Sequence, residues 1–160
     1  MAEYRSCTVD RTPAEVAVIG AGAAGLYTAL CVARAGGAVT LVSATPLAGA
    51  SSYWAQGGLA AALAAGDSAD LHLKDTIAAG RGAVRESAAR VLVQEAPSAV
   101  QDLIGLGVNF DVDRSGELSL GLEGGHSQRR IVHAGGAATG RRIIRQLSAV
   151  AAQHPGIEVI

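Results

Sequence analysis

The chain has 160 residues, which is the length of one domain or of a piece of a larger protein. Lys and Arg number 13 against 14 Asp and Glu, and this net charge of −1 argues against a nucleic-acid binder, which would carry a basic excess. With 49% apolar and 17% charged residues, the composition excludes a generally disordered chain. The two cysteines, Cys7 and Cys31, form neither a disulfide framework nor a metal-ligand spacing, so we expect no metal site and a reducing, cytoplasmic setting.

Residues 1–14 are predicted to be a polar tail without the pattern of a signal peptide, ahead of a folded part over 15–160. From Val16 to Gly66 the only charged residue is Arg34, but glycines interrupt this apolar stretch repeatedly. No uninterrupted apolar run approaches the roughly 18–20 residues that a membrane-spanning helix needs. We therefore expect no membrane segment.

The first predicted elements form a strand–helix–strand unit. The apolar run Val16–Ile19 is rich in β-branched residues and predicts a buried parallel strand. Apolar residues at helical spacing over 22–35 predict a helix that ends at Gly36. Residues 38–42 predict a second buried strand. The unit spans about 28 residues, the length typical of a βαβ unit.

Helices are predicted to dominate the middle of the chain. Residues 45–58 predict a loop and the alanine-rich residues 59–65 a short helix. A helix with capping residues at its start follows and runs to about Ala79. Residues 86–95 predict another helix, and Pro97 fits the first turn of a further helix that ends near Gly105 or Gly107.

The last third of the chain is predicted to be mixed. Residues 108–112 are expected to be extended, 113–116 to form a turn and 117–122 a strand. Thr139 is the predicted cap of a helix over 140–153, and residues 157–160 predict the start of a strand. A buried parallel strand at the very end of a chain is unusual, which leads us to expect the N-terminal part of a longer protein.

The turn after the first predicted strand carries the pattern G-x-G-x-x-G. In a βαβ unit Gly20 permits the tight turn, Gly22 lets the backbone approach a pyrophosphate, and Gly25 lets helix and strand pack closely. The start of the helix offers free N–H groups to the phosphates. We predict a dinucleotide site here, and the alternative is a glycine-rich turn without a ligand; the segment comprises Gly20, Ala21, Gly22, Ala23, Ala24 and Gly25.

The end of the second predicted strand lacks the acidic residue that usually holds the ribose in this fingerprint. That end reads Val42, Ser43 and Ala44, and no carboxylate occurs from Val16 to Gly66. Ser43 offers a hydrogen bond but is a poorer ribose clamp. The departure argues against an ordinary NAD dehydrogenase, and the alternative is a site that has decayed.

A second segment combines two hydroxyls, an amide and a glycine pair. The glycines allow the backbone to approach a planar ligand, and the side chain of Gln56 can both donate and accept hydrogen bonds. Alone, the segment is equally compatible with an ordinary polar loop. Beside the phosphate turn it predicts part of a flavin site made of Ser51, Ser52, Tyr53, Trp54, Ala55, Gln56, Gly57 and Gly58.

A third segment, residues 123–133, gathers a carboxylate, two imidazoles, a hydroxyl and two guanidinium groups. Arginine suits the carboxylate groups of a ligand because it binds them bidentately. Glu123 is a candidate partner for an ammonium group. The alternative is a solvated charged loop.

Four segments together resemble the succinate dehydrogenase and fumarate reductase flavoprotein family, in the order in which they occur there: GAGAAGLYTAL, SSYWAQGGLAA, DSADLHLKDTIAAGRG and EGGHSQRRIVHAGGAATG. The resemblance covers about residues 16–160, and EGGHS followed by RRI-H is more specific to the aspartate oxidase branch. It implies a Rossmann-like, doubly wound α/β FAD-binding domain, here incomplete, in which residues 21–24 line the pyrophosphate and 51–58 contact the flavin.

The resemblance also implies an activity. The branch oxidises L-aspartate to iminoaspartate, passes the electrons to oxygen or fumarate, and feeds quinolinate synthase in NAD biosynthesis. The succinate dehydrogenase branch links FAD covalently to a histidine where this chain has Ser51, so the flavin is expected to be non-covalent. Glu123 matches the glutamate near the substrate amino group, and its carboxylate would favour an ammonium-bearing substrate. His126 is a second candidate for substrate binding.

The chain departs from the family pattern in three places. Ala44 stands where a lysine is usual and Ala137 where an aspartate is usual, and the chain stops before the catalytic arginine and most substrate-binding residues of the family. We therefore expect the isolated chain to be inactive. Two alternatives stay open: a fragment of a fumarate reductase or succinate dehydrogenase flavoprotein, which a comparison of substrates would reveal, and a non-catalytic truncated remnant, which would lack stoichiometric flavin.

Overall fold

The computed structural model describes residues 15–160, and the predicted polar tail at 1–14 lies outside them. The chain runs through alternating strands and helices, as predicted for an α/β protein. The first half contains β1 (Val16–Ile19), α1 (Ala23–Arg34), β2 (Val39–Val42), the 3-10 turn η1 (Ser51–Trp54), β3 (Leu59–Ala60) and α2 (Ala69–Ala79). The second half contains α3 (Glu86–Gly105), β4 (Leu120–Gly121), β5 (Ile131–Val132), α4 (Thr139–Gln153) and β6 (Ile157–Val159).

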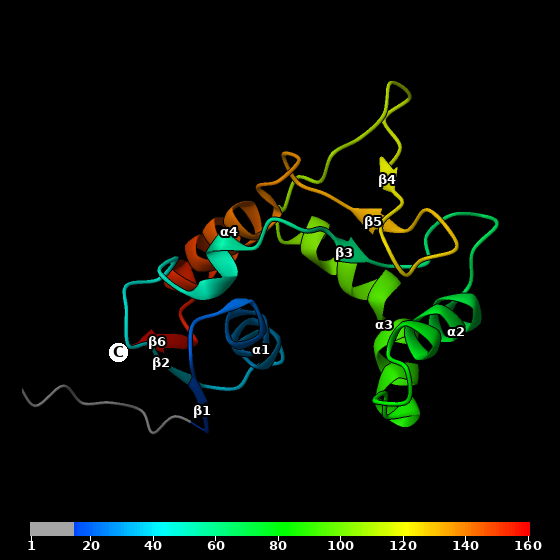
Figure 1. The fold of residues 1–160 in the computed structure, drawn as a ribbon. Helices are drawn as coiled ribbons and strands as arrows, with labels where there is room; N and C mark the ends of the chain where they lie inside the picture. Colours follow the sequence, from blue (N-terminus) through cyan, green and yellow to red (C-terminus); the bar gives the residue numbers. More distant parts are fainter. Residues whose placement is uncertain (1–14) are drawn as a thin grey trace, which may run out of the picture.

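The predicted βαβ unit is confirmed. Strands β1 and β2 are parallel, with Val16 opposite Val39, and β6 continues the parallel sheet on the other side of β2. Helices α1 and α4 pack against each other beside this sheet (Figure 1). Their facing stripes form the core because apolar residues recur on one side of each helix: Leu26, Ala29, Leu30 and Ala33 in α1, and Ile143, Ile144, Leu147 and Ala151 in α4.

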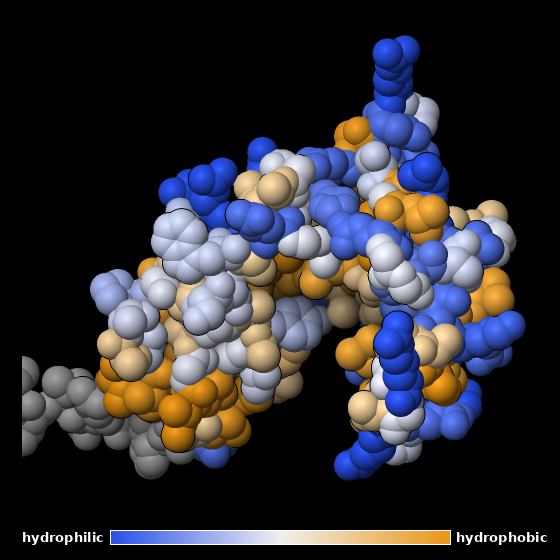
Figure 2. All heavy atoms as spheres, viewed as in Figure 1, coloured by the Kyte–Doolittle hydropathy of each residue, from blue (hydrophilic) through white to orange (hydrophobic). Residues whose placement is uncertain are grey.

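The expectation that β1 is a buried strand is wrong for most of its length. Only Val18 is buried, whereas Ile19 is 86% exposed. The reason is the order β1-β2-β6, which makes β1 an edge of the sheet within residues 15–160. Figure 2 shows apolar atoms gathered over this sheet beside the grey segment, and the exposed apolar residues of these strands include Ile19 and Val159.

A second, antiparallel sheet has the order β3-β5-β4 and lies with α2 and α3 on the other side of the molecule (Figure 1). The helix predicted over 59–65 is therefore wrong, because Leu59 and Ala60 pair with Val132 and Ile131 of β5. This pairing to a distant segment overrides the helical preference of the alanines. Strand β5 lies within the third segment, residues 123–133, for which the sequence predicted no strand.

Residues 86–105 form one helix, α3, with Pro97 inside it, so the prediction of two helices is wrong. Proline lacks the N–H that would continue the hydrogen-bond ladder. The two halves of α3 nevertheless pack on different clusters. Ala89 and Val93 contact the small cluster around Leu73 of α2, and Val100 and Leu103 belong to the main core. Tertiary packing on both sides of the proline keeps the helix continuous.

Three local predictions can be compared with observed hydrogen bonds. Ser68 caps α2, since its Oγ accepts a hydrogen bond from the Leu71 N–H at 3.1 Å. The turn at 113–116 is confirmed by Asp113, which accepts from the N–H of Ser115. Thr139 is not the cap of α4 but its first residue; its hydroxyl donates to the Gly136 carbonyl and accepts from the Ala134 N–H, and so fixes the preceding loop.

The two sides of the molecule are joined by polar contacts between α1 and α3. Asp102 accepts a bidentate pair of hydrogen bonds from Arg34 and another from the Tyr27 hydroxyl, at 2.7–2.8 Å. Within residues 15–160, none of the helices combines the length and the apolar character that crossing a bilayer requires.

Candidate functional site

The glycine turn between β1 and α1 has the geometry that its sequence predicts. Gly20 has φ +103°, a left-handed backbone conformation that favours glycine, and its N–H donates to the Val42 carbonyl at 2.8 Å. A Cβ on Gly25 would overlap the Gly20 carbonyl, and one on Gly22 would lie 3.2 Å from Ser52 Oγ. Gly20 and Gly25 are therefore required for the turn to be this tight, whereas a Cβ at position 22 would crowd the Ser52 hydroxyl.

The start of α1 is prepared for an anion. Its N-cap is Gly22, which offers no side-chain acceptor, and the first turn contains no acidic residue. The N–H of Ala23 donates to Ser52 Oγ at 3.2 Å. The N–H groups of the first turn lack intrahelical partners by construction and carry the positive end of the helix dipole. This start of α1 suits the diphosphate of a dinucleotide.

Ser52 brings the second predicted segment against the first. It lies in η1, which packs on α4, where Gly140 donates its N–H to the Ala55 carbonyl at 3.0 Å. A Cβ on Gly140 would overlap the Ser52 carbonyl, so this contact also needs glycine. Trp54, at the end of η1, is 75% exposed. The segment 51–58 thus extends from the phosphate turn along one face of the molecule.

Ser43 lies directly after β2, at the carboxyl end of the strand where a ribose would be held. Its hydroxyl donates to the Thr45 carbonyl at 2.6 Å. This local bond uses the one hydrogen of the hydroxyl, so Ser43 can offer a ribose only its acceptor lone pairs.

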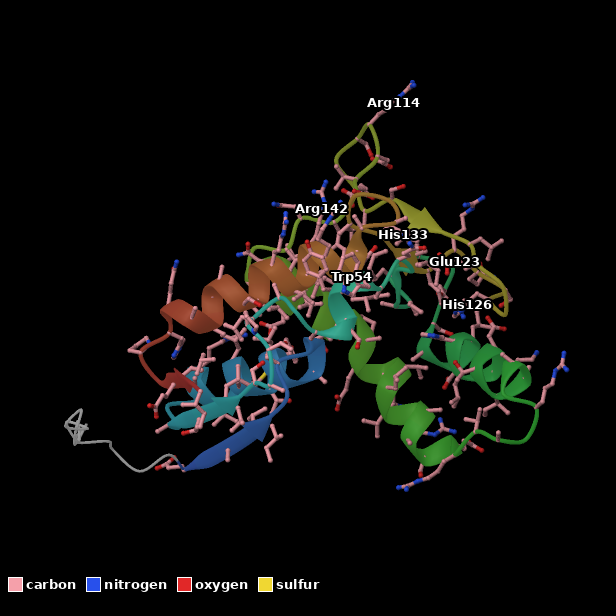
Figure 3. The ribbon with its side chains drawn as sticks, turned by 60° about the vertical axis from the view of Figure 1, so that its left-hand side comes forward. Trp54, Arg114, Glu123, His126, His133 and Arg142 are labelled. Carbon is pink, nitrogen blue, oxygen red and sulfur yellow. The ribbon has the colours of Figure 1, made fainter. Side chains whose placement is uncertain are left out.

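A pocket of about 530 Å³ lies where the second and third segments meet. Figure 3 shows Glu123 and His133 close together, beyond Trp54 at the end of η1. Glu123 Oε1 lies 3.1 Å from His133 Nε2. The polar residues around the pocket are Gln56, Asp111, Ser119, Glu123, Arg129 and His133. Charges of both signs therefore face one cavity beside the segment predicted to contact a flavin.

Asp111 is a member of this pocket that the sequence did not single out. Its two carboxylate oxygens accept hydrogen bonds from the N–H groups of Gly135 and Gly136 at 2.7 and 2.9 Å. These two bonds hold the pKa of Asp111 below its usual value. Ala137 lines the same pocket, and Asp111, from a distant part of the chain, binds the loop that precedes it. No local signal in residues 108–112 indicated it.

His126 lies outside the lining of this pocket and contacts a buried charged cluster instead. At its centre is Arg130, whose side chain is fully buried. Arg130 donates two hydrogen bonds to Asp67 at 2.8 Å and one to Asp75 at 2.7 Å, and its Nη1 lies 3.2 Å from His126 Nδ1. The cluster ties the third segment to α2. Sequence reasoning identified Arg130 only as part of a charged segment and missed both aspartates.

The hydrogen bonds of this cluster govern its ionisation. Ser127 donates its N–H and its hydroxyl to Asp75, and these bonds, with those from Arg130, lower the pKa of Asp75 to about 2. Burial opposes the ionisation of Asp67, but the bonds from Arg130 and the Ser68 N–H prevail and lower its pKa. His72 lies beside the cluster with its ring 5.4 Å from that of His126, and burial followed by the Arg130 charge lowers the pKa of His72.

Comparison with known proteins identifies the family of this chain. Residues 15–160 match the FAD binding domain family. L-aspartate oxidase from Mesorhizobium japonicum is 54% identical over 144 residues, covering 89% of this chain and 28% of the relative, and the enzyme named so from Streptomyces coelicolor is 49% identical over 134 residues, covering 84% and 23%. The chain thus spans about a quarter of the length of these curated relatives.

Two solved structures share the fold. E. coli quinol fumarate reductase superposes with a TM-score of 0.87 at 27% identity, over 91% of this chain and 25% of that one. A flavocytochrome c3 fumarate reductase superposes with a TM-score of 0.80 at 28% identity, over 91% and 26%. The glycine turn, the open start of α1 and the family match over 15–160 agree, and the chain belongs to the FAD binding domain family.

Proposed function

We propose that this chain is the FAD-binding, N-terminal part of an L-aspartate oxidase, which oxidises L-aspartate to iminoaspartate and passes the electrons through FAD to oxygen or fumarate. The observation that carries the proposal is the pocket in which Glu123 faces the same cavity as Gln56 of the 51–58 segment. Its support from related proteins is the 49–54% identity to two enzymes of that name.

When FAD is bound, it supplies the redox chemistry by accepting a hydride from the substrate. The residues of this chain bind FAD and orient the substrate. The glycine turn at 20–25 and the start of α1 hold the diphosphate, and the segment 51–58 lies against the flavin ring. Because Ser51 offers no imidazole for a covalent link, FAD is held non-covalently.

Glu123 recognises the substrate by charge. L-Aspartate carries an ammonium group that succinate lacks, so a carboxylate in the pocket favours aspartate and disfavours a plain dicarboxylate. Arg129 lines the same pocket and provides a planar cation for a substrate carboxylate. The pocket therefore recognises the ammonium group of the substrate through Glu123 and a carboxylate group through Arg129.

Iminoaspartate is consumed by quinolinate synthase in NAD biosynthesis, which makes that enzyme the expected neighbour of this one. The setting is the cytoplasm, and neither nucleic acid nor a membrane takes part.

The second candidate is a fumarate reductase or succinate dehydrogenase flavoprotein, favoured by the TM-score of 0.87 with quinol fumarate reductase. Two residues count against it. A plain dicarboxylate has no ammonium group for Glu123 to attract, and Ser51 stands where a covalent flavin needs a histidine. A non-catalytic remnant is the third candidate, and stoichiometric FAD in the purified protein would exclude it.

The test compares substrates and variants in the full-length gene product. We expect turnover of L-aspartate, little turnover of succinate, and one FAD per chain released on denaturation. Glu123→Gln should raise the KM for L-aspartate at least tenfold, about 1.4 kcal/mol, because an amide does not attract an ammonium group as a carboxylate does. Glu117→Gln is the matched control on the neighbouring turn. Equal turnover of succinate, or an unchanged KM in Glu123→Gln, would contradict the proposal.

A further inference from the structure

His133 follows β5 and lines the pocket that holds Glu123. Its Nε2 lies 3.1 Å from Glu123 Oε1, and Figure 3 shows the two side chains next to each other. The contact sets a ring nitrogen of the imidazole against one oxygen of the carboxylate. The other carboxylate oxygen of Glu123 is then available to a ligand.

The imidazole of His133 is held from several sides. Its backbone carbonyl accepts a hydrogen bond from the Asp111 N–H at 2.7 Å. A Cβ on Gly58 would lie 3.1 Å from His133 Cε1, and a Cβ on Gly121 would lie 3.2 Å from His133 Nε2. Contacts this close leave room for the ring only because both neighbours are glycines. Gly58 belongs to the segment 51–58 and Gly121 to β4, so the ring connects the flavin-contacting segment to Glu123.

Asp111 is the other carboxylate of the pocket, but it is already engaged. Both of its oxygens accept hydrogen bonds from the N–H groups of Gly135 and Gly136. Arg129 lines the pocket as well, and Arg142 interacts electrostatically with Asp111. Glu123 is thus the carboxylate of this pocket that a ligand ammonium can approach. The orientation of the Glu123 side chain decides whether the carboxylate contacts that ammonium group.

We propose that His133 is a positioning residue that holds the Glu123 carboxylate in the pocket for the ammonium group of an α-amino dicarboxylic acid. The inference rests on the proposed function and names the group that makes Glu123 selective. The side chain of Glu123 is 48% exposed, so without the imidazole it gains rotamer freedom and turns toward water. Binding of an ammonium-bearing ligand then has to order the Glu123 side chain again, which weakens that binding.

The test measures the binding of L-aspartate and of succinate to the FAD-loaded, full-length gene product, from the shift in flavin absorbance on rapid anaerobic mixing, before any reduction of the flavin. His133→Leu should weaken L-aspartate binding about tenfold and leave succinate binding within about twofold, since succinate has no ammonium. His133→Gln keeps an N–H donor near the position of Nε2 and should retain most of the affinity. Arg114→Ala, at the outer tip of the 113–116 turn in Figure 3, is the control and should change neither constant.

A double-mutant cycle separates positioning from a general structural role. In a Glu123→Gln background, His133→Leu should cause no further loss of L-aspartate affinity, because the group that it orients is gone. Equal weakening of both ligands, or a full further loss in the Glu123→Gln background, would overturn the inference. If L-aspartate binds with this coupling but is not oxidised, the proposed function fails and the positioning role stands.

Discussion

Single residues fix the cofactor site most tightly at the glycine turn. Position 25 has no room for a side chain, since a Cβ there would overlap the backbone carbonyl of Gly20. The turn and the start of α1 must therefore move apart if any other residue is placed at 25. Because the N–H groups of that first turn are the ones that would bind the diphosphate, a small displacement acts directly on FAD affinity.

Gly25→Ala should weaken FAD binding by at least tenfold, measured by quenching of flavin fluorescence on titration. Overpacking at such a contact also costs about 1–3 kcal/mol of stability, so the free energy of unfolding should be measured in parallel. Gly66→Ala is the matched control, because a Cβ at Gly66 meets nothing within 4 Å. Unchanged FAD affinity in Gly25→Ala would show that the diphosphate does not lie on this turn.

His72 makes stability depend on pH. It is 2% exposed, its Nδ1 lacks a hydrogen-bond partner within the described structure, and burial together with the Arg130 charge lowers its pKa. Below the ordinary histidine pKa of about 6.5 the unfolded chain therefore binds a proton that the folded chain resists. The contribution of neutral His72 is complete above that pH and is lost as the pH falls through the lowered pKa of the folded state.

We expect the free energy of unfolding to fall between pH 7 and 5, with a His72 contribution of at most about 1.4 kcal/mol per pH unit. Urea denaturation at several pH values measures it. In His72→Leu that part of the slope should vanish, whatever the change in absolute stability. An identical slope in both proteins would mean that His72 is not held neutral in the fold. The further loss from Asp75, whose pKa is about 2, belongs below pH 4.

Among the elements, α2 and the third segment depend on each other through Arg130. The guanidinium and the side chain of Asp67 are both fully buried, and Asp67 accepts two of its hydrogen bonds. Replacing such a pair as a whole is often neutral, but removing one partner leaves an uncompensated buried charge. The cluster therefore fixes where the 123–130 segment lies relative to α2.

Asp67→Asn should lower the free energy of unfolding by about 3–5 kcal/mol, seen as a lower midpoint in thermal or urea denaturation. The exposed pair of Arg90 and Glu86 on α3 provides the control, since breaking it with Glu86→Gln should cost at most about 0.5 kcal/mol. Equal effects from the two substitutions would show that the Arg130 cluster is open to water.

Elements with a local pattern were predictable and elements that depend on distant partners were not. The periodicity of α1 and α4 and the β-branched runs of β1 and β2 located those four elements. Strands β3 and β5 have two residues each, too few for any period, and exist because they pair with each other. At the site, the glycine turn follows from local steric rules, whereas Asp111 and Asp67 act across the chain and carry no local mark. Pro97 led to the wrong prediction of two helices, because packing on both sides of the proline keeps α3 continuous.

For the molecule as a whole, the chain contains the glycine turn and the pocket lined by Glu123 and His133, over about a quarter of the length of its curated relatives. The isolated 160-residue chain should therefore not oxidise L-aspartate, even with added FAD. Release of hydrogen peroxide from L-aspartate and oxygen is a sensitive assay for this. Measurable turnover by the pure chain, with a heat-inactivated sample as blank, would refute the prediction.

The order of strands in the parallel sheet has a consequence during synthesis. Strands β1 and β2 are neighbours in sequence, but β6, which pairs with β2, begins at Ile157, far beyond the end of β2 at Val42. A ribosome that adds about 5–20 residues per second needs on the order of ten seconds to deliver it. For that time the nascent chain presents β2 with one open side, and a chaperone that shields strand edges would be most useful to it then.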